Sequence, residues 1–226
     1  MKMKKILFLI GFLSLSGLII QAAPPTTQGE IEVNQKRIAG VVSSSMRLET
    51  ARLILRKVEE RDLDDIYEYA KDPKVAELTG WTEHENLDDT RNFLDKMREG
   101  YNTGMYLYLV IEDKELHKVV GTCAIVHISF EKNCGEISLS FAKSHCGKGY
   151  GKEVINRLIQ FGFDEMGLDY LEGYTYQRNR ASDRLCQGAA EFQGEVKYEH
   201  KVKGKQSVRA NYYKLTREDY LTKLFG

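Results

Sequence analysis

The segment Cys146–Lys152 constrains the fold of this chain more than any other part of it. It places three glycines at alternate positions, between a strand-like run over 136–142 and a helix-like run over 154–159. Glycine lets the backbone curl so that successive N–H groups point into one concavity. Because this concavity lies at the positive end of a helix, the segment predicts a site that holds phosphate groups.

Two common phosphate-binding motifs do not fit this segment. A P-loop needs Gly, four residues and then Gly-Lys-Ser/Thr, and the sequence has no such spacing. A dinucleotide-binding turn needs the spacing G-x-G-x-x-G. Gly147, Gly149 and Gly151 form G-x-G-x-G instead.

The spacing resembles the pyrophosphate-binding loop of the GNAT superfamily of N-acetyltransferases, Arg/Gln-x-x-Gly-x-Gly/Ala. Gly149 and Gly151 match its last two positions, and Cys146 departs from the first. The run from Gly147 to Tyr150 is similar to the Trp-Gly-Lys-Gly-Tyr run of the RimJ/RimL-like branch. Three further segments resemble that branch in the same order: 48–56, 62–67 and 179–185. The resemblance therefore spans about residues 46–220.

The resemblance implies an α+β fold with a mixed, mostly antiparallel central sheet flanked by helices. The hydrophobic pattern favours the same class, because alternating and apolar strand-like runs are interrupted by segments with helical spacing. Three successive strands before the glycine loop indicate an antiparallel meander, and a final hairpin is expected to turn near Gly204. The three strands are predicted at 105–112, 119–130 and 135–142.

The resemblance also implies an enzyme that moves an acetyl group from acetyl-CoA directly to a primary amine. The acceptor is either a protein N-terminus or a small amine such as a polyamine or an antibiotic, and the sequence does not separate them. The alternative is a non-catalytic acyl-CoA-binding domain, because the segment 204–209 lacks the Asp that the branch often has after Gly.

The resemblance assigns the cofactor to three groups of residues. A strand end is expected to pair with the pantetheine arm, the glycine loop to hold the pyrophosphate, and an Asn-x-x-Ser segment to bind the pantetheine amide. Asn179 and Ser182 have a structural alternative, which is to cap the following helix. The expected cofactor residues are Ser140, Phe141, Ala142, Cys146, Gly147, Lys148, Gly149, Tyr150, Gly151, Lys152, Asn179 and Ser182.

Two residues are candidates for catalysis. Glu136 lies on the strand before the loop, where a half-buried carboxylate could accept the amine proton directly or through water. Its alternative is a place on a solvated strand face. Cys186 stands where many such enzymes have a Tyr that protonates the leaving thiolate, and its alternative is a buried apolar thiol.

Composition excludes several other functions. The 226 residues, 42% of them hydrophobic, can bury one core. After residue 45 the chain has 28 basic and 31 acidic residues, which argues against a nucleic-acid partner. None of the four cysteines forms Cys-x-x-Cys and the five histidines are scattered, so no metal site is expected. The protein is expected to be a monomer or a homodimer.

The first 45 residues differ from the rest. Residues 1–23 combine a basic start with an apolar run, as a secretory signal peptide does. Residues 24–45 are interpreted as a flexible linker, and 46–226 as the acetyltransferase domain. Met46 immediately precedes the domain, so the natural start is expected at Met46, with 1–45 as a spurious upstream extension. Since acetyl-CoA is cytosolic, we expect a cytoplasmic protein. Export or membrane anchoring through 1–23 is the alternative. A chain starting at Met46 is expected to be as stable as a longer one.

Overall fold

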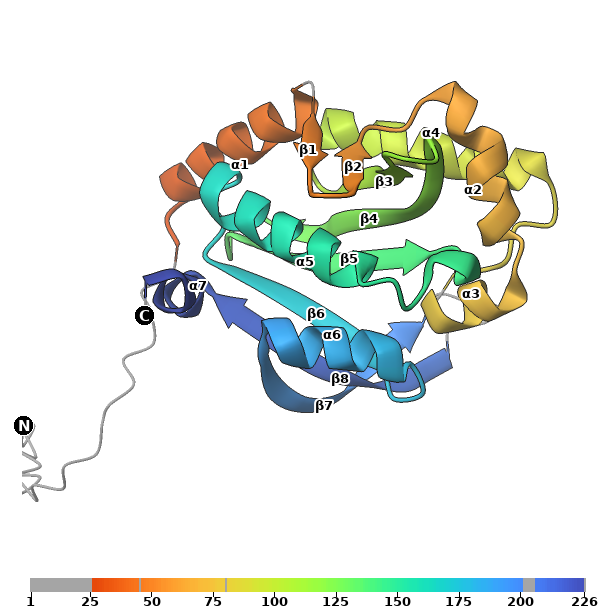
Figure 1. Cartoon of the computed structure of the whole chain (residues 1–226). Coiled ribbons are helices and arrows are strands. Elements are labelled where there is room, and N and C mark those ends of the chain that lie inside the picture. The colour runs from red at the N-terminus through yellow and green to blue at the C-terminus, as the bar shows by residue number, and fades with distance from the viewer. Residues whose placement is uncertain (1–25, 45, 80, 201–205, 226) are drawn as a thin grey trace, which may run out of the picture.

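The computed structural model describes residues 26–44, 46–79, 81–200 and 206–225. Its described strands form a single eight-stranded sheet in the order β1-β2-β3-β4-β5-β6-β8-β7 (Figure 1). All neighbouring strands are antiparallel except β5 and β6, so the predicted fold class is confirmed. The strands are β1 Arg47–Glu49, β2 Leu53–Arg56, β3 Leu107–Asp113, β4 Lys118–Ser129, β5 Cys134–Phe141, β6 Tyr170–Tyr176, β7 Glu191–His200 and β8 Gln206–Thr216.

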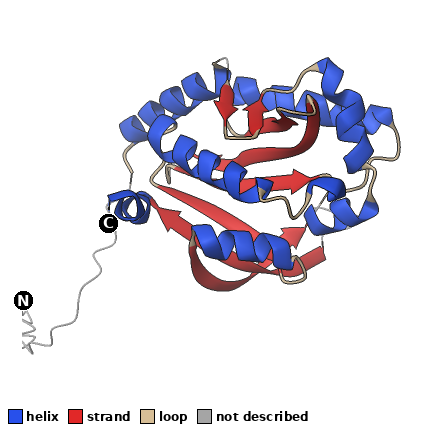
Figure 2. Ribbon diagram, in the orientation of Figure 1, coloured by secondary structure: helices blue, strands red, loops and turns tan. Residues whose placement is uncertain are grey.

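Helices cover both faces of the sheet (Figure 2). Helices α1, α5 and α6 lie on one face, and α2 and α4 cover the opposite face of β3 and β4. Successive side chains of a strand point to opposite faces of the sheet, so the core is divided into two clusters. Leu109 packs in the cluster that includes α5, and its neighbour Val110 packs in the cluster that includes α2 and α4. The helices are α1 Gln28–Ser43, α2 Leu63–Ala70, α3 Pro73–Thr79, α4 Leu87–Thr103, α5 Tyr150–Gln160, α6 Arg180–Ala189 and α7 Arg217–Phe225.

The predicted meander is confirmed, because β3, β4 and β5 pair in sequence order as antiparallel neighbours. The turn expected near Gly204, between β7 and β8, lies outside the described residues. Helix α5 begins directly after the glycine loop and continues as a π-helical turn over Phe161–Glu165 before the positive-φ Gly167. The sequence therefore located the strand–loop–helix unit on which the site depends.

Strands β5 and β6 separate after a short parallel pairing. They pair at only three positions among the described residues, with Glu136 opposite Glu172 as the last of them. Beyond this point β5 continues to Phe141 along β4, and β6 continues to Tyr176 along β8. The sheet is therefore open between the second half of β5 and the second half of β6.

The predicted flexible linker over 24–45 is wrong for most of its length, because residues 28–43 form helix α1. Thr27 and Glu30 close a capping box at its start, and Ile38 and Val42 are completely buried in the core. Further contacts hold α1 in place: Asn34 donates a hydrogen bond of 3.0 Å to the carbonyl of Phe130. The low overall apolar content hid these few buried positions.

The signal-like segment 1–23 lies outside the described residues. In the parts of the chain that are described, no helix combines the length and apolar character needed to span a membrane.

Candidate active site

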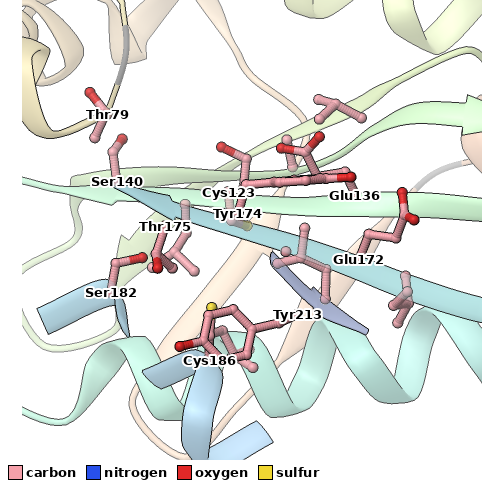
Figure 3. A pocket seen from close by; sticks show the side chains of 18 of the residues that line it. Thr79, Cys123, Glu136, Ser140, Glu172, Tyr174, Thr175, Ser182, Cys186 and Tyr213 are labelled. Carbon is pink, nitrogen blue, oxygen red and sulfur yellow. The ribbon is translucent and has the colours of Figure 1, made fainter. Parts of the chain in front are cut away.

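A cavity of about 500 Å³ occupies the opening between β5 and β6. It is lined from one face of the sheet by α5 and α6 and from the other by Trp81 and Tyr108. Among the lining residues labelled in Figure 3, Glu136 and Glu172 lie on one side, and Ser140 and Ser182 lie on the opposite side. Of the residues predicted from the sequence, five line this cavity: Glu136, Ser140, Asn179, Ser182 and Cys186.

The glycine loop follows β5 and has a left-handed backbone at two of its glycines. Gly147 has φ +78° and Gly149 has φ +83°, values that glycine tolerates and other residues rarely adopt. Gly149 is also the N-cap of α5 and has no side chain to occupy the free N–H groups of the first turn. The exposed loop residues Cys146, Lys148 and Lys152 do not line the cavity, and the loop stands beyond the end of β5.

Polar contacts fix the start of α5. The carboxylate of Glu153 accepts hydrogen bonds from the Thr50 hydroxyl at 2.7 Å and from the Arg52 guanidinium at 2.5 Å. The buried Tyr150 donates to Asp113 at 2.6 Å. Since the Tyr150 side chain faces the protein interior, only its backbone is available to a ligand at the loop. These contacts hold the loop against the turn between β1 and β2 and against the end of β3.

The end of β5 offers fewer free groups than its sequence suggested. Ser140 is 7% exposed and its hydroxyl lies 3.2 Å from that of Thr122. The N–H of Ala142 donates to the carbonyl of Val120 at 2.9 Å, so it is already used. Phe141 packs against Tyr150, with ring centroids 6.4 Å apart. The N–H of Ala142 is therefore not available to polarise a thioester oxygen.

Asn179 caps α6, as the structural interpretation of this residue predicted. Its side-chain oxygen accepts from the N–H of Ser182 at 3.1 Å, and its amide donates to the carbonyl of Leu78 at 3.1 Å. The carboxylate of Asp183, the residue after Ser182, accepts hydrogen bonds from the Tyr213 hydroxyl at 2.6 Å and from the Asn211 amide at 2.7 Å. Although burial acts against it, these hydrogen bonds lower the pKa of Asp183, and the ionised side chain ties α6 to β8.

Glu136 is 9% exposed, so its alternative placement on a solvated strand face is wrong. One carboxylate oxygen lies 2.8 Å from Nδ1 of His127, and the hydroxyl of Tyr198 donates to the carboxylate at 3.2 Å. Burial, together with the charge of Glu136, raises the pKa of Tyr198, so this phenol stays protonated at neutral pH. Glu136 is thus a buried carboxylate, held in one orientation at the closed end of the cavity.

Sequence reasoning missed the partners of Glu136. His127 lies on β4 and belongs to no recognisable sequence motif, and Tyr198 lies on β7. The β4–β5 hairpin pairs Val126 with Glu136, so counting back from its turn would have placed His127 beside Glu136. No comparable local signal points to Tyr198, because β7 reaches the site through β8 and β6.

Cys186 lines the cavity from α6 and does not resemble a reactive thiol. Burial, and to a lesser degree the charge of Asp183, raises its pKa to about 12. A thiol with so high a pKa is a poor proton donor to a departing thiolate near neutral pH. The structure therefore favours the interpretation of Cys186 as an unreactive thiol, in a partly buried position.

We expect Cys186→Ala to leave turnover within about three-fold of the wild-type value, because loss of a true general acid costs about 10²- to 10⁴-fold. Steady-state rates of CoA release measure this directly. A loss of about 100-fold or more in a folded Cys186→Ala protein would assign the thiol a catalytic role. The buried Cys134 provides the matched control, since Cys134→Ala removes a thiol outside the cavity and outside the glycine loop.

Comparison with known proteins agrees with this fold and site. The Acetyltransferase (GNAT) domain family matches residues 52–189. The chain is 29% identical over 159 residues to the uncharacterized N-acetyltransferase p20 of Bacillus licheniformis, which covers 70% of this chain and 89% of that protein. The structure of ribosomal-protein-S5-alanine acetyltransferase from Vibrio fischeri superposes with a TM-score of 0.65 at 19% identity, covering 77% of this chain and 98% of that one.

Spermidine N-acetyltransferase from Vibrio cholerae, solved with CoA and spermine, has the same fold. It superposes with a TM-score of 0.65 at 19% identity, covering 76% of this chain and 99% of the other. The fold, the opening between β5 and β6, and the glycine loop are together typical of a transferase that uses an acyl-CoA. The chain belongs to the GNAT acetyltransferase family. It is an acetyl-CoA-dependent N-acetyltransferase, which confirms the predicted family and co-substrate.

Proposed function

We propose that this enzyme transfers the acetyl group directly from acetyl-CoA to a primary amine, without a covalent acyl-enzyme. The observation that carries the proposal is the cavity at the opening between β5 and β6, which is lined from both faces of the sheet. Such a cavity lets the thioester and the amine meet from opposite faces. Holding the two reactants together supplies much of the catalysis that such a reaction needs.

The residues of β5 and the glycine loop fit acetyl-CoA in length and chemistry. Glu136 and Phe141 are five residues apart, which is roughly 17 Å of strand. The unpaired edge of β5 offers backbone groups to an extended pantetheine arm. The positive-φ glycines and the free N–H groups of the first turn of α5 offer donors to the pyrophosphate. The acetyl group then lies near the closed end of the opening.

Glu136 accepts the proton that the amine loses on attack. Its carboxylate is buried, oriented by His127 and Tyr198, and lines the same cavity as the expected thioester position. Acetyl-CoA supplies an activated carbonyl carbon and a thiolate leaving group. Since Cys186 stays protonated and weakly acidic, the leaving thiolate takes its proton from solvent or from the incoming amine.

The acceptor side of the cavity favours a positively charged amine. Glu136 and Glu172 are register partners on β5 and β6, so their side chains share one face of the sheet. Tyr174 stacks on Tyr212 at 5.1 Å and approaches Tyr198 at 4.8 Å, which makes an aromatic wall beside these carboxylates. Among the described residues no Lys or Arg lines the cavity. Carboxylates and tyrosine faces attract ammonium groups.

The test is CoA release with a panel of amines, followed by mass spectrometry of the products. A matched series separates the acceptor classes: 1,4-diaminobutane, butylamine, 4-aminobutyrate and a peptide with a free N-terminus. The proposal expects an N-acetyl product with at least one amine and no acetylated protein intermediate. If the protein binds acetyl-CoA but acetylates no amine in the panel, a non-catalytic acyl-CoA-binding function replaces the proposal.

Glu136→Gln is expected to lower turnover by about ten-fold or more at neutral pH, because the amide cannot accept the amine proton. The affinity for acetyl-CoA should change little, since the substitution keeps the size of the side chain. Steady-state kinetics with varied acetyl-CoA separates the two quantities. Glu68→Gln, on the exposed side of α2, is the control. Equal turnover in Glu136→Gln and wild-type protein would exclude Glu136 as the base.

A further inference from the structure

The proposed reaction produces a proton that must leave the site. An ammonium substrate and acetyl-CoA give an N-acetylamine, CoA with its thiol protonated, and one proton released to solvent. The amine nitrogen forms a bond to the acetyl carbon while the carbon–sulfur bond breaks, and the base holds a proton from the amine. The side chain of Glu136 is only 11% exposed, so it needs a route by which to return that proton to water.

Among the residues that the structure describes, two side chains form hydrogen bonds with Glu136, and they differ in their ability to carry a proton. Tyr198 donates its own proton to the carboxylate, and burial together with the charge of Glu136 raises its pKa, so it has no capacity for a second proton. His127 differs, because its Nδ1 lies 2.8 Å from the carboxylate and 61% of its side chain is exposed. The imidazole therefore connects the buried carboxylate with solvent.

The backbone presents His127 in an unusual way. Its φ is +48°, a left-handed conformation that non-glycine residues seldom adopt. The residue lies where the β4–β5 register shifts between Val126 and Ser129. Such irregularities redirect a side chain and are found near active sites. At this irregularity the ring of His127 lines the cavity and contacts Glu136.

We propose that His127 carries the proton from Glu136 to solvent in each catalytic cycle. This inference rests on the proposed function, since it needs Glu136 to act as the base. In the resting site Nδ1–H of His127 donates to the ionised Glu136. Once Glu136 holds the amine proton, the exposed imidazole exchanges through solvent to the Nε2–H tautomer. Nδ1 then accepts the proton from Glu136 and Nε2 releases one to water, which restores the Nδ1–H tautomer. The carboxylate is then ionised again for the next amine. His127 is a positioning and relay residue in this scheme, because it acts through Glu136.

The test compares two substitutions that suit the left-handed backbone. His127→Asn keeps a side chain able to donate to Glu136 but unable to carry a proton onward, and Asn tolerates this conformation well. We expect its kcat to fall about ten-fold or more, in the range for loss of proton transfer, with the KM for acetyl-CoA nearly unchanged. His127→Gly leaves space at the same position, and added imidazole is expected to restore its rate in a concentration-dependent manner.

The outcomes separate the relay from the underlying function. If wild-type protein turns over and His127→Asn matches it, the relay is overturned and the histidine at most orients Glu136. Absence of any imidazole effect on a slow His127→Gly protein overturns it as well. If wild-type protein itself consumes no thioester with any amine, the proposed function is overturned, and the relay with it.

Discussion

Deleting residues 1–45 is expected to destabilise the protein strongly, contrary to what the composition of the segment suggests. The deletion removes α1, whose Ile38 and Val42 side chains are completely buried. Burial of one such side chain contributes about 1.5–3 kcal/mol, so the two together contribute about 3–6 kcal/mol. The deletion also removes Arg37, which donates a hydrogen bond of 2.8 Å to the side chain of Asn133.

A loss of this size is a large fraction of the free energy of unfolding of a typical domain, about 5–15 kcal/mol. It should lower the melting temperature by roughly 10 °C or more. A chain that starts at Thr26 keeps the whole of α1 and is the matched control. Thermal unfolding of the two truncated chains, which start at Met46 and at Thr26, gives the two melting temperatures to compare. Equal melting temperatures would show that α1 contributes nothing to the core.

Gly149→Val is expected to weaken acetyl-CoA binding by about 10- to 100-fold. A β-branched residue cannot easily hold φ +83°, and the strain is about 1–3 kcal/mol. Its Cβ would also lie 3.3 Å from the guanidinium of Arg52, a flexible and partly exposed side chain that can move aside, so the backbone strain is the main cost. If the loop relaxes out of its curled shape, its N–H groups no longer converge on a pyrophosphate. Each 1.4 kcal/mol lost in binding is about ten-fold in affinity.

Calorimetric titration with acetyl-CoA measures this loss. Gly194→Val separates it from general destabilisation, because Gly194 also has a positive φ, +123°, and a Cβ there meets no described atom within 4 Å. The control should lose stability but keep its affinity. Unchanged binding in a folded Gly149→Val protein would remove the glycine loop from the cofactor site.

Features encoded locally were predictable from the sequence. The glycine loop combines alternating glycines with a flanking strand and helix, so its position and its curled backbone followed from a short segment. Asn179 was expected to cap a helix because Asn and Ser satisfy free N–H groups at helix starts. The antiparallel meander followed from successive strand-like runs joined by short turns.

Features that depend on pairing between distant strands were harder to predict. The surroundings of Glu136 combine residues of β4, β5 and β7, and only the β4–β5 hairpin could have been read locally. The hydrophobic pattern of α1 is weak, because two buried positions among polar residues hardly alter the average hydropathy of the segment. Its packing against the core was therefore not predicted. In that segment the capping box of Thr27 and Glu30 was the stronger signal.

Hydrogen–deuterium exchange with and without acetyl-CoA tests the central claim, that the cofactor lies along the open edge of β5 with its pyrophosphate on the glycine loop. We expect acetyl-CoA to slow amide exchange in peptides covering 137–141 and 147–152. Saturating pantetheine, which lacks the pyrophosphate, should slow exchange in 137–141 but not in 147–152. Protection by acetyl-CoA confined to other strands, or equal protection of the loop by pantetheine, would contradict this account.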